Sequence, residues 1–221
     1  MSSDELDEFL ALFCTAIQNV DGEYMRTIYH EMAYVVDIIN NENQQQYMRR
    51  NVVGNDIVRT GERIFCYELY HQLRLLMGPM RDQFPHLYLQ GELRKHQVPE
   101  LLEAMNIGEL DGNYMPDFLL HTPGSTDDHP YVIEVKTDRF LTYPQVTGDL
   151  KKVVQFMCEY NYQRGIFLTA NTSSDFVDNH FRNNNTIRQI GHIQQFADQI
   201  YIINVEHEHA QPTVRLLSSW L

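Results

Sequence analysis

The chain has 221 residues, 43% hydrophobic and 21% charged, a composition typical of a globular protein that buries a sizeable core and forms, by default, one domain. No apolar run approaches the roughly 20 residues of a membrane span, and the acidic start MSSDELDE lacks the positive charge of a secretory signal. We therefore expect a cytoplasmic protein with no membrane partner. The net charge of −13 argues against a generally basic, nucleic-acid-binding surface, and three scattered cysteines argue against a disulfide framework.

Apolar residues at helical spacing predict two helices at the start of the chain, over residues 4–19 and 23–39. The polar run NNENQQQ follows, so we predict an N-terminal helical arm over residues 1–48 and a second unit over 49–221. The apolar stripes of the arm need cover, which could come from the core, from a second copy of the chain or from another protein.

The later part of the chain predicts a long helix followed by a sheet. The helix spans about 56–77 and ends at Gly78-Pro79. The elements after it are a strand at 86–93, a short helix near 98–105, strands at 114–121 and 131–137, a helix over 145–162, a strand at 165–170, one or two short helices over 175–195, and a strand at 199–206. This mixture favours an α/β layer fold around a central mixed sheet.

The negative charge is concentrated at the start of the chain. Residues 1–48 hold nine acidic residues against one arginine, a charge of −8, so only −5 remains for everything after them. The later segment is therefore close to neutral, and it contains all four lysines of the chain: Lys95, Lys136, Lys151 and Lys152.

Charged side chains interrupt two neighbouring predicted strands where a buried strand should carry none. In YVIEVK the side chains alternate, so Ile133 and Val135 are expected on one face and Glu134 and Lys136 on the other. Asp117 lies on the preceding strand, and hairpin pairing would bring it within reach of Glu134. Two carboxylates would then share one site.

Two carboxylates held close together need a cation, and oxygen ligands with retained waters suit Mg²⁺, with Mn²⁺ as a substitute. Lys136, two residues after Glu134, is placed to orient water and to offset charge on a phosphoryl oxygen. Glu68, on the long helix, and Glu92, after the first strand, are further candidate ligands. This layout is typical of a hydrolase.

Pro116-Asp117, a gap of sixteen residues, and Glu134-Val135-Lys136 resemble the signature of the PD-(D/E)XK nucleases. The predicted element order over about residues 56–205 resembles the αβββαβ core of their restriction-endonuclease-like fold. The resemblance implies that Asp117 and Glu134 bind the divalent metal, that the Val135 carbonyl adds a ligand, and that Lys136 serves the attacking water.

The same resemblance assigns roles to the flanking helices. Glu68 matches the acidic residue that many members carry on the first core helix. The helix after the motif often lends polar side chains to the site, and the candidates for substrate contacts are Lys151, Lys152 and Gln155.

The expected function is that of a Mg²⁺-dependent phosphodiesterase, a nuclease or endonuclease acting on DNA rather than RNA, in genome defence, repair or mobile-element processing. One alternative is a protein that keeps the nuclease fold without turnover and acts as a binding or assembly subunit, as a homo-oligomer or with a protein partner bound through residues 1–48. A third is an acidic mimic of nucleic acid, supported by the charge of −8 on the predicted arm.

Overall fold

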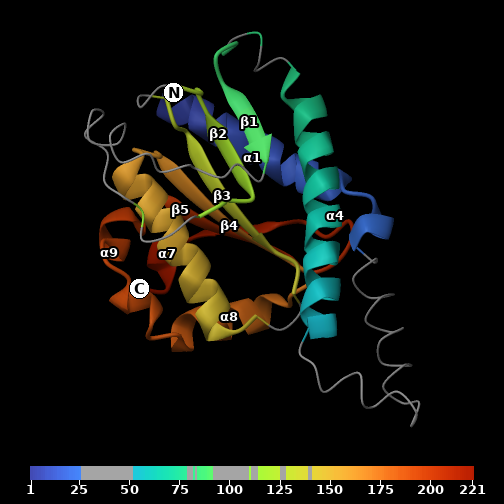
Figure 1. Ribbon diagram of the computed structural model, residues 1–221, viewed down its shortest axis with the longest axis vertical. Helices are drawn as coiled ribbons and strands as arrows, with labels where there is room; N and C mark the ends of the chain where they lie inside the picture. Colours follow the sequence, from blue (N-terminus) through green and yellow to red (C-terminus); the bar gives the residue numbers. More distant parts are fainter. Residues whose placement is uncertain are drawn as a thin grey trace.

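The computed structural model describes residues 1–25, 52–78, 82, 84–91, 110, 114–124, 128–138 and 141–221 (Figure 1). Several predictions fall wholly or partly outside these residues: the helix over 23–39, described only as far as residue 25, the strand at 86–93, described only as far as residue 91, the short helix near 98–105, the site residue Glu92, and the boundary at residue 48. The other predicted helices and strands are found, with ends that differ by a few residues.

A six-stranded mixed sheet in the order β1-β2-β3-β4-β5-β6 forms the centre of the fold. Its strands are β1 (Tyr88–Gly91), β2 (Phe118–His121), β3 (Tyr131–Lys136), β4 (Arg164–Ala170), β5 (Ile200–Val205) and β6 (Thr213–Leu216). β1, β2 and β3 are antiparallel neighbours, β4 and β5 run parallel to β3, and β6 is antiparallel to β5. The predicted α/β fold with a central mixed sheet is confirmed.

Helices cover both faces of this sheet, and their ends follow local sequence signals. They are α1 (Ser3–Asn19), α4 (Val52–Leu76), α7 (Tyr143–Glu159), α8 (Ser174–Asn183) and α9 (Ile193–Phe196), with 3₁₀ turns at Ile187–Gln189 and Leu217–Ser219. Ser2 and Glu5 form a capping box at the start of α1. Thr142 and Gln145 do the same for α7. Parallel pairing of β3 and β4 requires a crossover connection, which α7 provides.

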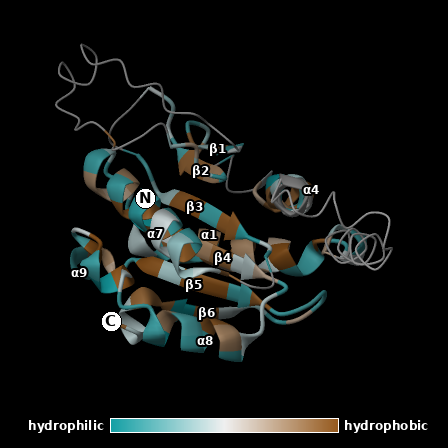
Figure 2. Ribbon diagram, turned by 60° about the horizontal axis from the view of Figure 1, so that its bottom comes forward, coloured by the Kyte–Doolittle hydropathy of each residue, from teal (hydrophilic) through white to brown (hydrophobic). Residues whose placement is uncertain are grey.

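The sheet separates two hydrophobic clusters. Ile133 and Val135 of β3 pack with α1 and α4, whereas Val132 packs with α7 and α8 on the opposite face. The predicted alternation along β3 is thus confirmed, and Figure 2 shows hydrophobic residues concentrated on the central strands β3 and β5. None of the helices in the described part of the chain combines the length and apolar character that a membrane crossing requires.

α1 takes its cover from the core itself. Phe9 and Phe13 are fully buried in the cluster that also contains Ile133 of β3, and the Phe9 ring lies 4.8 Å from the ring of Tyr131. The Tyr131 hydroxyl donates a hydrogen bond to the Leu6 carbonyl at 2.7 Å. The described helix of the predicted arm is therefore packed on the same core as the sheet, and its apolar stripe needs neither a second copy nor another protein.

Candidate functional site

The charged residues that interrupt the predicted strands meet near the end of β3. Antiparallel pairing aligns Phe118, the first residue of β2, with Ile133. Asp117 directly precedes β2, across from Glu134, and its Oδ2 accepts a hydrogen bond from the Val135 N–H at 2.7 Å. The predicted pairing of these two strands is confirmed, and it fixes the Asp117 carboxylate beside β3.

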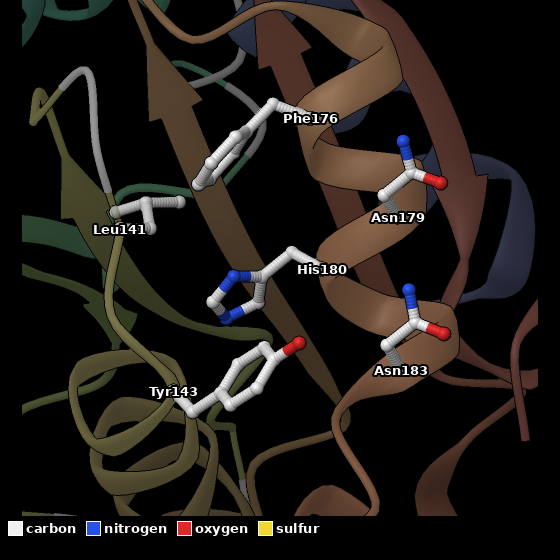
Figure 3. Close-up of a pocket in the computed structure, with 6 residues that line it drawn as sticks. All are labelled: Leu141, Tyr143, Phe176, Asn179, His180 and Asn183. Atoms are coloured by element: carbon white, nitrogen blue, oxygen red, sulfur yellow. The ribbon is translucent and has the colours of Figure 1, made fainter.

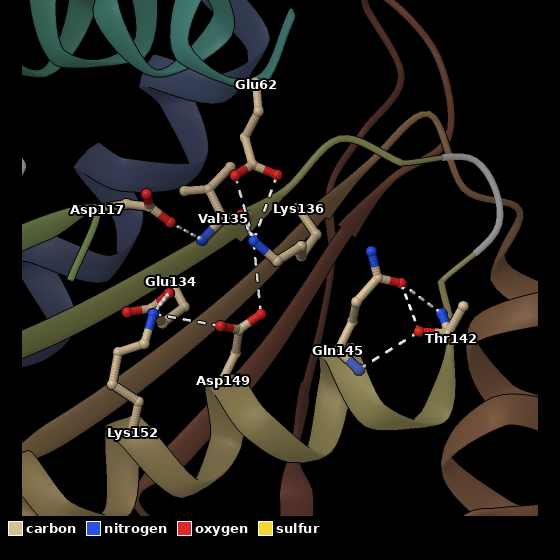
Figure 4. A network of polar contacts seen from close by, with 9 residues as sticks. All are labelled: Glu62, Asp117, Glu134, Val135, Lys136, Thr142, Gln145, Asp149 and Lys152. Carbon is tan, nitrogen blue, oxygen red and sulfur yellow. Dashed lines mark hydrogen bonds and ion pairs between the residues drawn. The ribbon is translucent and has the colours of Figure 1, made fainter. Parts of the chain in front are cut away.

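Glu134 lies on the face of β3 that α7 covers, and its side chain is 1% exposed. The ammonium group of Lys152, on α7, donates a hydrogen bond to Glu134 Oε2 at 2.6 Å (Figure 4). The other oxygen, Oε1, is buried and accepts no hydrogen bond from any described residue. Glu134 therefore has one oxygen neutralised by lysine and one whose hydrogen-bonding capacity is unused.

Lys136 bridges the two helical layers. Its Nζ lies 3.2 and 3.3 Å from the two carboxylate oxygens of Glu62 on α4, and 3.5 Å from Asp149 Oδ2 on α7. The same nitrogen donates to the Val135 carbonyl at 3.2 Å, so the carbonyl predicted as a metal ligand accepts a hydrogen bond from Lys136. We call the whole group the carboxylate–lysine cluster: Glu62, Asp117, Glu134, Lys136, Asp149 and Lys152 (Figure 4).

Among the described side chains of α4, Glu62 is the acidic residue that joins the cluster, in place of the predicted Glu68. Six residues of helix separate the two side chains by about 9 Å along the axis and direct them to different sides. Glu68 accepts a hydrogen bond from Gln72 Nε2 at 2.6 Å. The signal that sequence reasoning missed is spacing: Glu62 precedes the buried Phe65 by three residues and the buried Leu69 by seven, so it begins the same stripe.

Asp149 is the second residue that sequence reasoning missed. It stands three residues before Lys152 on α7, and its Oδ1 lies 3.2 Å from Lys152 Nζ. Residues three apart on a helix are neighbours, so this acid–base pair was visible in the sequence. Together with its contact to Lys136, Asp149 connects the two lysines of the cluster.

The remaining predicted site residues lie farther from this arrangement or outside the described residues. Lys151 is exposed on α7, next to the partly buried Lys152. Gln155 is half-buried, and its Oε1 is buried without a hydrogen-bond partner among the described residues. Glu92 lies outside the described residues. Of the three residues predicted to contact substrate, Lys152 is joined to the cluster by its contacts with Glu134 and Asp149.

Burial is the main cause of the raised carboxyl pKa values in the cluster. It raises the pKa of Glu62 to about 7, with repulsion from Asp117 and Asp149 adding to the effect and attraction to Lys136 opposing it. Burial likewise raises the pKa of the carboxyls of Asp117 and Glu134. For Lys136, burial favours a lower pKa, but the surrounding carboxylates outweigh burial and raise the pKa. The raised pKa of Lys136 reflects an excess of negative charge, because four carboxyl groups face two ammonium groups.

The oxygen donors of the cluster match the ligand chemistry of Mg²⁺ or Mn²⁺. In the described part of the chain, no three His, Cys, Asp or Glu side chains gather closely enough to hold an ion by themselves. Asp117 and Glu134 are the two carboxylates that could share one ion, with water or phosphate oxygens completing its shell. The buried Oε1 of Glu134 supports this fit, because it is an acceptor whose hydrogen bonding no described residue satisfies.

Comparison of the chain with protein-family models, with curated proteins and with solved structures gave no match. The resemblance to the PD-(D/E)XK signature therefore remains a prediction from the residues. The interpretation of the carboxylate–lysine cluster depends on its own geometry and electrostatics.

Proposed function

We propose that the chain is a metal-dependent nuclease that hydrolyses phosphodiester bonds, with DNA as its substrate. The observation that carries the proposal is the meeting of Asp117, Glu134 and Lys136 at the end of β3, with Glu62 facing them from α4. The order of elements also supports it, because α4, the antiparallel β1, β2 and β3, α7 and the parallel β4 follow one another as in the αβββαβ core of restriction-endonuclease-like proteins.

In the proposed reaction, Asp117 and Glu134 would hold a divalent ion, which would supply Lewis-acid activation of water and phosphate. The Lys136 ammonium positions the attacking water and offsets negative charge that grows on a phosphoryl oxygen. Glu62, whose pKa is raised to about 7 by burial, is matched to accept a proton from that water near neutral pH. The P–O bond opposite the attacking water breaks, and the leaving oxygen takes a proton from solvent. Lys152 orients the buried Glu134 carboxylate by a hydrogen bond, and its positive charge opposes the rise in the pKa of Glu134 that burial causes.

The second candidate function is a binding or assembly subunit with this fold and no turnover. The observation that favours it is the pairing inside the cluster: Lys152 lies 2.6 Å from Glu134, and Lys136 contacts both Glu62 and Asp149. Such pairing neutralises carboxylates without a metal. The two candidate functions differ in whether a divalent ion displaces the ion pairs inside the cluster. Assays of cleavage and of metal binding distinguish them.

The test is a panel of linear, circular and single-stranded DNA and RNA, incubated with Mg²⁺, Mn²⁺ or chelator. We expect cleavage in metal and none in chelator, because carboxylates by themselves cannot offset the charge of the transition state. Asp117→Ala and Glu134→Ala should abolish cleavage, and Lys136→Ala should lose about 10²-fold or more in rate while retaining metal binding. Full activity in chelator would contradict the mechanism, and ordinary rates in Lys136→Ala would contradict the role of that lysine.

The two acidic residues of α4 form a matched pair for the same assay. Glu62→Gln should lower the cleavage rate because Glu62 contacts Lys136, whereas Glu68→Gln should not, because Glu68 is hydrogen-bonded to Gln72 on another side of the helix. A lower cleavage rate in Glu68→Gln, with an unchanged rate in Glu62→Gln, would assign the catalytic role to Glu68 instead.

A further inference from the structure

A pocket of about 320 Å³ lies between the first turn of α7 and α8. β3 ends at Lys136 and β4 at Ala170, so the pocket and the carboxylate–lysine cluster lie toward the same edge of the sheet, where the parallel strands end. In α/β sheets this edge is where ligands bind. The pocket is lined by Leu141, Tyr143, Phe176, Asn179, His180 and Asn183 (Figure 3).

Three aromatic rings form the walls of the pocket. The ring of His180 lies 4.5 Å from the ring of Tyr143 and 5.8 Å from that of Phe176, measured between centroids. Figure 3 shows the His180 ring directed from α8 toward Leu141 and Tyr143. The Tyr143 side chain is 45% exposed, so part of this aromatic surface is open to a ligand.

The polar groups of the pocket are neutral and include one unused hydrogen-bonding atom. His180 is 5% exposed, and its Nε2 is buried without a hydrogen-bond partner among the described residues. Leaving such an atom unpaired is unfavourable, and a ligand that hydrogen-bonds to it would remove this cost. Asn179 and Asn183 stand one helical turn apart on α8, and both are exposed. Each amide offers a donor and an acceptor.

These features select the class of ligand. The described residues that line the pocket carry no formal charge, and burial lowers the pKa of His180, so its imidazole is neutral at pH 7. An anion such as phosphate would find no cation in this lining. A flat ring with hydrogen-bonding groups on its edge satisfies both the aromatic walls and the amides, and a nucleobase has this chemistry.

We propose that this pocket binds one unstacked nucleobase of the strand that is cut, with the ring stacked on Tyr143 and its edge bonded by Asn183 and His180. The inference depends on the proposed function for the identity of the substrate. A base held here would fix the position of the strand relative to the carboxylate–lysine cluster, and would make cleavage depend on one nucleotide of that strand.

The test measures binding of fluorescently labelled single-stranded oligonucleotides in which each nucleotide in turn is replaced by an abasic residue. It uses the Lys136→Ala protein in Mg²⁺, to slow cutting, and the native chain in chelator. We expect one abasic position to weaken binding by about 5- to 150-fold, the range for stacking of one base on an aromatic side chain. Tyr143→Ala should weaken binding of the intact strand to a similar degree and should abolish the effect of that abasic position.

Tyr88→Ala is the matched control, because Tyr88 is also 45% exposed but lies on β1, at the opposite edge of the sheet from β6. It should leave the abasic effect unchanged. Asn183→Ala removes an exposed amide and should reduce discrimination among the four bases at the same position. This second variant keeps the test informative should Tyr143→Ala fail to fold.

The outcomes separate this inference from the proposed function. Metal-dependent cleavage with no abasic-sensitive position would overturn the nucleobase pocket and leave the nuclease assignment in place. An abasic effect that Tyr143→Ala cancels, without cleavage in any metal, would support the pocket and overturn the catalytic assignment. Additive effects of the abasic residue and Tyr143→Ala, or no binding of any oligonucleotide, would also overturn the pocket.

Discussion

Replacing Glu62 by glutamine should stabilise the metal-free protein at alkaline pH. The side chain of Glu62 is 19% exposed, so solvent screens its interactions only weakly. Burial and the neighbouring carboxylates raise its pKa from 4.5 to about 7, and this net value already includes the attraction of Lys136. Each pKa unit is worth ~1.36 kcal/mol, so ionised Glu62 destabilises the folded state by about 3 kcal/mol. Glutamine removes this cost while keeping the size of the side chain.

The sign of the pH dependence follows from linkage. Because the folded pKa of Glu62 is above the unfolded value, the folded state binds more protons between about pH 4.5 and pH 7, and its stability falls as the pH rises through that window. The free energies of unfolding of the native chain and Glu62→Gln should therefore be nearly equal below about pH 4.5. Above about pH 8 the variant should be more stable by about 3 kcal/mol.

Urea denaturation at several pH values, with chelator present, measures this difference. Glu68→Gln is the matched control on α4, and we expect a change within about 0.5 kcal/mol because its hydrogen bond with Gln72 can be kept by an amide. Mg²⁺ should stabilise the native chain more than Glu62→Gln, since the ion neutralises the excess charge of the cluster. A variant that is equal to or less stable than the native chain at pH 8.5 would refute the reasoning.

Three further substitutions test the packing around the site. Lys152→Met should destabilise the protein by about 3–5 kcal/mol at alkaline pH, because the buried Glu134 loses the cation beside it. The destabilisation should be smaller near pH 5, where Glu134 can take up a proton. Urea denaturation curves at the two pH values measure this difference. Phe9→Ala should cost about 3–5 kcal/mol of unfolding free energy, and a change below 1 kcal/mol would show that α1 is separable from the core. Gly165→Ala places a Cβ 2.4 Å from Val153 Cγ1, so we expect about 1–3 kcal/mol of destabilisation and a lower Tm. An unchanged Tm would contradict this close packing.

Much of the fold could be predicted because helices and strands follow patterns that repeat over a few residues. The alternation in YVIEVK correctly separated the two faces of β3, and the apolar stripe of α4 was visible at helical spacing. β6 was missed for the same reason: three of its four residues are exposed, so it carries no alternating apolar signal. An edge strand that is held by pairing and has no buried face cannot be predicted from alternating apolar residues.

The sequence by itself determined which charged residues interrupt the strands near the end of β3, because that depends only on neighbours along the chain. It did not determine their partners. Lys136 and Glu62 are 74 residues apart, and their contact depends on how α4 lies against the sheet. The same holds for α1, whose hydrogen bond from Tyr131 to Leu6 spans 125 residues and joins the predicted arm to the core. Only the tertiary structure sets such contacts, because the angle and position of one packed element against another are fixed by side chains that are distant in the sequence.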